Sequence, residues 1–140
     1  MSDSTLNLDW LVSVDDHVLE PPNVWQDRVP AKYRDVAPRM ETAADGEFWC
    51  YEDKRLPTTG LSAVAGKKRE EFTPEPITYA EMRPGCYDRD ERVKDFALNW
   101  TDGSLPFPTF PRFCGQTFMD GNDLDLGLAC VQAYNDWMIE

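Results

Sequence analysis

The distribution of proline and glycine is the feature that most limits what this chain can fold into. The 140 residues include eleven prolines and eight glycines, and most of them lie between Pro21 and Gly121. Proline removes a backbone N–H donor and restricts the residue before it, whereas glycine favours turns. The pattern therefore predicts many turns and few long elements over that stretch. The length is sufficient for one domain with a core.

Two short segments have the character of strands. Residues 11–14 (Leu-Val-Ser-Val) form an apolar run that predicts a buried strand, and Asp15, Asp16 and His17 follow at its end. Residues 103–108 predict a second strand, although Pro106 inside it would remove a donor from the hydrogen-bond ladder.

A small antiparallel ribbon is predicted at about residues 38–57. Asp45-Gly46 is a dipeptide typical of a type I′ turn, and it lies between two β-rich arms, residues 39–43 and 47–52. A third short strand is expected at Arg55-Leu56. The ribbon would be an insertion that follows the first strand.

Two helices are predicted, one over residues 88–98 and one from residue 124 onward, with Asn122 or Asp123 as the cap of the second. The second helix has apolar residues at helical spacing, namely Leu124, Leu128, Val131 and Met138. Residues 110–118 are expected to form a loop. The resulting order of strand, insertion, helix, strand, loop and helix is typical of α/β folds with parallel strands.

Charge and cysteine content narrow the classes of function. The net charge is −12, from 26 acidic and 14 basic residues, and a negative field disfavours binding to nucleic acid or to anionic membranes. Residues 1–9 are polar and do not resemble a signal peptide, and no segment is apolar enough to span a membrane. The four cysteines are widely spaced, which indicates reduced thiols and a cytoplasmic location.

The triplet Asp15-Asp16-His17 is a candidate metal site. Residues two apart on a strand project to the same side, so Asp15 and His17 can face one point while Asp16 turns away. A carboxylate oxygen and an imidazole nitrogen would suit zinc or a similar divalent ion. The alternative is that His17, the chain's single histidine, is a surface residue in an acidic loop.

Several blocks resemble amidohydrolase-related enzymes of the aminocarboxymuconate-semialdehyde decarboxylase branch. In family order they are residues 12–22, Val24-Trp25, and residues 28–33, 83–88, 107–116 and 133–138. The resemblance implies a TIM-type (β/α)8 barrel, of which residues 1–140 would be the N-terminal part, because such a barrel takes about 250 residues.

The resemblance also implies an activity and a site. Asp15 and His17 match two ligands of a divalent metal, which would be zinc or, alternatively, manganese. The reaction would be hydrolysis or non-oxidative decarboxylation of a small carboxylated molecule. Arg112 and Gln116 would lie near the mouth of the barrel and contact the substrate carboxylate, unless they are ordinary loop residues.

The family's remaining ligands and its catalytic aspartate come from later strands, so no catalytic residue is assigned and the isolated chain is expected to be inactive. Self-association or binding to the remainder of a barrel is expected, because an incomplete barrel leaves strand edges open. The alternative function is that of a non-catalytic remnant or a protein-interaction module.

Overall fold

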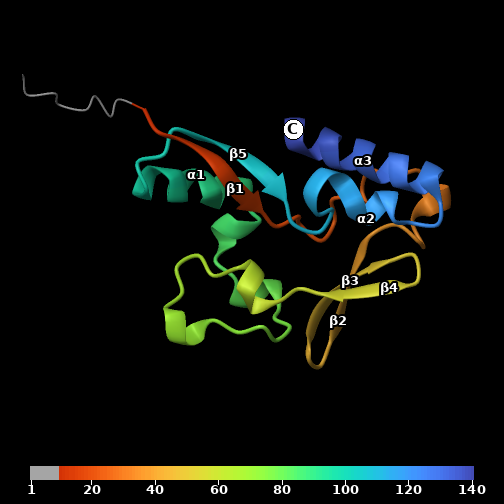
Figure 1. Cartoon of the computed structure of the whole chain (residues 1–140), viewed down its shortest axis with the longest axis horizontal. Coiled ribbons are helices and arrows are strands. Elements are labelled where there is room, and N and C mark those ends of the chain that lie inside the picture. The colour runs from red at the N-terminus through yellow and green to blue at the C-terminus, as the bar shows by residue number, and fades with distance from the viewer. Residues whose placement is uncertain (1–9) are drawn as a thin grey trace, which may run out of the picture.

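The computed structural model describes residues 10–140, and the expectation for residues 1–9 lies outside this range. Strands β1 (Val12–Val18) and β5 (Gly103–Pro108) form a parallel pair in which His17 lies beside Phe107. Helix α1 (Arg89–Leu98) precedes β5 and lies beside the pair (Figure 1). The predicted mixed α/β class with parallel strands is confirmed, while the complete barrel stays a prediction.

Strand β1 is not buried, contrary to the prediction. Val12 and Val14 expose 42% and 71% of their surface. The parallel sheet of the described residues has only two strands, so neither strand has a neighbour at its outer edge. β1 also continues to Val18, which places Asp15 and His17 inside the strand rather than after it.

The predicted ribbon is present as a second sheet, of β2 (Arg39–Ala43), β3 (Gly46–Tyr51) and β4 (Lys54–Pro57). The predicted turn is wrong, because Ala43 pairs with Gly46 and the loop is therefore Ala44-Asp45. Neither loop residue has the positive φ that a type I′ turn requires. Residue 46 must be glycine for another reason. Its φ is 132°, and a Cβ there would lie 2.8 Å from Cβ of Pro76.

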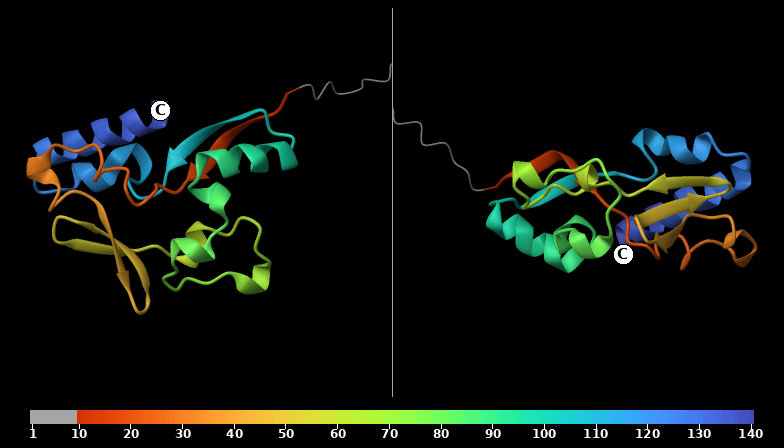
Figure 2. Two further views of the ribbon diagram at one scale, coloured as in Figure 1. Left: turned by 180° about the vertical axis from the view of Figure 1, so that it is seen from behind. Right: turned by 90° about the horizontal axis from the view of Figure 1, so that it is seen from below.

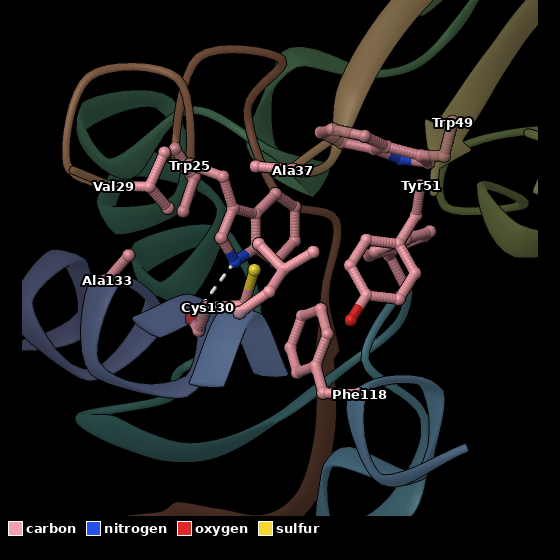
Figure 3. Close-up of a cluster of buried hydrophobic side chains, with 11 residues drawn as sticks. Trp25, Val29, Ala37, Trp49, Tyr51, Phe118, Cys130 and Ala133 are labelled. Atoms are coloured by element: carbon pink, nitrogen blue, oxygen red, sulfur yellow. Dashed lines mark hydrogen bonds between the residues drawn. The ribbon is translucent and has the colours of Figure 1, made fainter. Parts of the chain in front are cut away.

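The main core packs the ribbon against residues 24–29, α2 (Gln116–Met119) and α3 (Leu124–Ile139). Trp25 is fully buried at its centre, and its ring lies edge-on to those of Trp49 and Phe118, at centroid distances of 5.0 and 5.8 Å. The indole Nε1 of Trp25 donates a hydrogen bond of 3.1 Å to the backbone oxygen of Cys130 (Figure 3). Aromatic packing thus joins the ribbon to the last helix.

Helix α3 has the predicted position, and the carboxylate of Asp123 caps it by accepting hydrogen bonds from the amides of Asp125 and Leu126. Its buried face differs from the predicted stripe: the buried residues are Leu126, Gly127, Cys130 and Ala133. The predicted residues Leu124, Leu128, Val131 and Met138 are all exposed. The helix is apolar on two sides, and the described residues cover only one of them.

Short helical turns make up much of the remaining chain. The 3-10 helices are Ala31–Tyr33, Gly60–Ser62, Arg69–Glu71, Tyr79–Glu81, Pro84–Cys86 and Phe113–Gly115. The last of these and the first three residues of α2 lie within residues 110–118, which were predicted to be a loop. Residues 60–86 lie beside the ribbon (Figure 2), and the amide of Ile77 donates to the backbone oxygen of Thr58 at 2.8 Å.

All four cysteines are free thiols, in agreement with the prediction that they do not form a disulfide framework. Across residues 10–140, no helix has both the length and the apolar character that crossing a bilayer requires.

Candidate functional site

The carboxyl-terminal half of β1 brings Asp15 and His17 together. Oδ1 of Asp15 lies 3.8 Å from Nε2 of His17, and both side chains are mostly exposed. The pairing of β1 with β5 shifts register between Ser13 and Asp16, so the strand carries a bulge immediately before the histidine. Bulges redirect side chains within a strand. The geometry presents one carboxylate and one imidazole to the same open space.

Asp16 points away from this pair and binds Arg92 of α1. The Arg92 guanidinium lies 2.6 Å from Oδ2 of Asp16, and it also donates to the backbone oxygens of His17 and Gly85. Both members of this ion pair are more than two-thirds buried. Arg92 therefore connects β1, α1 and the turn at Gly85, and it holds the backbone that carries His17.

A buried carboxylate connects the ends of the two parallel strands. Glu20 is 0% exposed, and its two oxygens accept hydrogen bonds from the amides of Thr109 and Phe110 at 2.9 and 3.0 Å. The hydroxyl of Thr109 donates to the backbone oxygen of Val18 at 2.8 Å. Burial raises the pKa of the Glu20 carboxyl to about 7, although the two amides act in the opposite direction.

A cavity of about 380 Å3 lies between β1, α1 and residues 62–65. His17 and Asp16 form part of its strand wall, and Arg92 and Asn99 form part of its helix wall. Asp15 is not among its lining residues.

A second cavity of about 190 Å3 lies between the ribbon and the chain that leaves β5. Its lining includes Arg112, one of the two residues predicted to bind substrate. Gln116, the other, is exposed at the start of α2 and lines neither cavity. Only Arg112 of the two therefore lines a cavity, and the predicted roles of both residues remain predictions.

Asp15 and His17 suit a divalent metal only as part of a ligand set. Among residues 10–140, no group of three or more His, Cys, Asp and Glu side chains is placed to hold a metal ion. A catalytic zinc ion typically has three protein ligands and one open position. The carboxylate oxygen and imidazole nitrogen fit two of these positions, and any further ligand would come from outside the described residues.

Two residues that position the site, Glu20 and Arg92, were missed from the sequence, and so was Thr58, which lines the second cavity. The sequence could have indicated a buried role for Glu20, since it is a charged residue between Leu19 and Pro21 directly after a strand. In the sequence, Arg92 looks like an ordinary charged residue on an exposed helix. Thr58 looks like a polar residue in a turn. The groups that Glu20 and Arg92 bind lie far away in the sequence, so local patterns do not identify these residues.

Comparison with solved structures finds several similar chains. No protein-family model matches the sequence, and no curated protein matches it. The crystal structure of an amidohydrolase from Mycobacterium avium subsp. paratuberculosis K-10 superposes with a TM-score of 0.63 and 18% sequence identity, over 94% of this chain. This chain spans 38% of the length of that amidohydrolase chain. At this identity the likeness shows a shared fold.

Proposed function

We propose that the chain is the N-terminal part of a metal-dependent enzyme with an amidohydrolase-type barrel. The observation that carries this proposal is the position of Asp15 and His17, 3.8 Å apart at the carboxyl-terminal half of a parallel strand. Barrel enzymes place their active sites at the carboxyl ends of the strands. The likeness to the mycobacterial amidohydrolase supports the same assignment.

In this proposal Asp15 and His17 supply two metal ligands, and the remaining strands of the barrel supply the others. The bound metal, zinc or manganese, would polarise the substrate or activate water for hydrolysis or non-oxidative decarboxylation of a small carboxylated molecule. Glu20 and Arg92 act as positioning residues, because they fix the ends of β5 and β1 through buried hydrogen bonds. The 140 residues alone would have no turnover.

Metal binding to the chain by itself tests this assignment. We expect zinc to bind weakly, with a Kd above about 1 μM, because two ligands without further support rarely hold zinc tightly. His17→Ala should abolish the residual binding measured by isothermal titration calorimetry. Asp90→Asn is the control, since Asp90 is an exposed carboxylate on α1 that pairs with Arg89.

Two results would contradict the proposal. Zinc binding that survives His17→Ala would show that the metal uses other residues. Equal losses in His17→Ala and Asp90→Asn would show that the ion is attracted only by the overall negative charge.

A second candidate function, that of a protein-interaction module, is favoured by the uncovered face of α3. Leu124, Leu128 and Met138 lie on this face and expose 73%, 58% and 38% of their surface. Val14 on β1 and Leu105 on β5 are also exposed. Exposed apolar side chains that share one face of a helix are typical of interaction sites.

Self-association of the purified chain is the expected consequence. In sedimentation velocity we expect dimers or larger species at micromolar concentration, and we expect Leu128→Lys to shift the distribution toward monomer, because a charge in the contact is costly to desolvate. Thr42→Lys is the control, because it adds the same positive charge at an exposed position of the ribbon instead of on α3. A wild-type monomer, or the same shift in both variants, would contradict this role for α3.

A further inference from the structure

One face of α3 carries a regular stripe of side chains that the described part of the chain leaves exposed. The stripe, called the seam below, has intervals of four, three, four and three residues and consists of Leu124, Leu128, Val131, Asn135 and Met138. Figure 1 shows α3 along one margin of the molecule. The buried residues of the helix lie on its other side, so the core of the chain already holds α3 in place.

The spacing of the seam is that of a coiled coil. Alternating intervals of three and four residues place the a and d positions of a heptad on the face that meets a partner helix. In this register Leu128 and Asn135 occupy a positions, and the d positions are Leu124, Val131 and Met138. The seam therefore has one polar residue among four apolar ones.

The seam carries no charge. The charged side chains within α3 are Asp125 and Asp136, and both lie about a third of a turn away from the seam. A second helix can therefore cover the seam without removing a charge from water, which would be costly.

Apolar side chains of the segment after β5 adjoin the seam. A groove of about 410 Å3 lies beside Val131 and Asn135, and Phe107 and Phe113 form part of its wall. Phe113 exposes 71% of its surface, and the four apolar residues of the seam expose between 37% and 73%. A fully exposed side chain of this kind offers roughly 100 Å2 of apolar surface, whereas a standard interface buries about 800 Å2 on each partner. The available area therefore suits a weak, reversible dimer.

Asn135 selects between the two orientations that the spacing allows. The intervals are symmetric about Val131, so a second copy could pack in parallel or antiparallel. In an antiparallel pair Asn135 would face Leu128 of the second copy, and its amide would be buried without a hydrogen-bond partner. In a parallel pair Asn135 meets its own counterpart, and the two amides can bond to each other. A single asparagine at an a position is known to specify register and oligomeric state in this way.

We propose that α3 forms a parallel, two-stranded coiled coil with the α3 of a second copy of this chain, in which the seam is the contact and the two Asn135 side chains hydrogen-bond to each other. The inference rests on the second candidate function, self-association through α3, and adds the partner, the orientation and the residue that selects it. Because each copy has a net charge of −12, added salt should strengthen the dimer by screening the repulsion.

Disulfide trapping tests the orientation. In the parallel pair the two copies of residue 138 lie side by side, whereas in an antiparallel pair they lie about 20 Å apart. We expect Met138→Cys to give covalent dimers in a glutathione buffer, in a Cys114→Ser background that removes the exposed native thiol. Asp136→Cys in the same background is the matched control, because residue 136 is on the same helix but faces away from the seam. It should not cross-link, since the two thiols are too far apart.

Sedimentation equilibrium of Asn135→Leu tests the role of the asparagine. Asparagine in the seam fixes the oligomeric state at a cost in stability, so leucine should lower the Kd of the dimer at least about tenfold and should allow larger species. Asn99→Leu makes the same substitution at an exposed position at the end of α1 and should leave the Kd unchanged. Circular dichroism should show that both variants are folded, because both positions are exposed in the single chain.

The parallel coiled coil is overturned if Met138→Cys and Asp136→Cys cross-link equally, if Asn135→Leu associates as wild type does, or if added salt dissociates the dimer. A cross-link between Leu124→Cys and Met138→Cys chains, without one in Met138→Cys alone, would show an antiparallel pair. That result would overturn the inference and leave self-association through α3 intact. If another partner or a further segment covers the seam, the purified chain stays monomeric, which overturns both. The metal proposal is tested separately, by the zinc titration that depends on His17.

Discussion

Replacing Trp25 with alanine is expected to lower the free energy of unfolding by about 3–5 kcal/mol, one of the two largest effects predicted for this chain. The indole is fully buried and contacts the rings of Trp49, Phe110 and Phe118. Its removal leaves a cavity where the ribbon, the exit of β5 and α2 meet, and the backbone oxygen of Cys130 loses a hydrogen bond. Urea unfolding followed by circular dichroism would measure the loss.

Trp100→Ala is the matched control, because Trp100 is the same residue type with 86% of its surface exposed. Its substitution should change the free energy of unfolding by less than about 0.5 kcal/mol. Trp25→Phe, which keeps an aromatic ring, should fall between the two alanine variants and remains informative if Trp25→Ala does not fold. Similar losses for Trp25→Ala and Trp100→Ala would refute this description of the core.

The second large effect concerns Glu20 and pH. The pKa of Glu20 rises from its usual 4.5 to about 7 because folding removes the carboxyl from water. The folded state therefore holds this proton more tightly than the unfolded state does. The stabilisation from the protonated form is fully present below about pH 4.5 and is lost as the pH rises through about 7, a change of about 3 kcal/mol.

Glu20→Gln separates this effect from the other titrating groups, since glutamine stays neutral. Glutamine turns an N–H donor toward one of the two amides and is expected to destabilise the fold, but by an amount that does not depend on pH. The difference in unfolding free energy between wild type and Glu20→Gln should therefore shrink between about pH 5 and pH 8. A constant difference across that range would show that Glu20 does not titrate as described.

Glu20 also connects stability to the proposed function. Its carboxylate holds Thr109 and Phe110, and both residues line the cavity that contains Thr58 and Arg112. The Thr109 hydroxyl in turn binds the backbone of β1 next to His17. Any change that releases Glu20 should therefore disturb the wall of this cavity and the metal-ligand pair together.

Local sequence patterns determined most of the element positions. The strand at 103–108, the ribbon at about 38–57 and the helix capped by Asp123 all lie where the sequence predicts them. The alternation of apolar and polar residues, turn residues and helix caps all depend on residues that are near one another in the chain. A few consecutive residues are therefore enough to predict these elements. The spacing that places Asp15 beside His17 is local in the same way.

Tertiary packing decided which surfaces are covered. Helix α3 has apolar residues on two sides, and contact with Trp25 and Phe118 selects the side with Cys130, not the side with Leu128. The hairpin loop is Ala44-Asp45 and not Asp45-Gly46, and Gly46 instead lies where Pro76 leaves no room for a side chain. Glu20 is buried against Thr109 and Phe110, which are about 90 residues away in the sequence and donate hydrogen bonds to its carboxylate. Thr58 is also buried, in the wall of a cavity that distant segments form. Burial depends on which distant segments meet, and no pattern within a few residues contains that information.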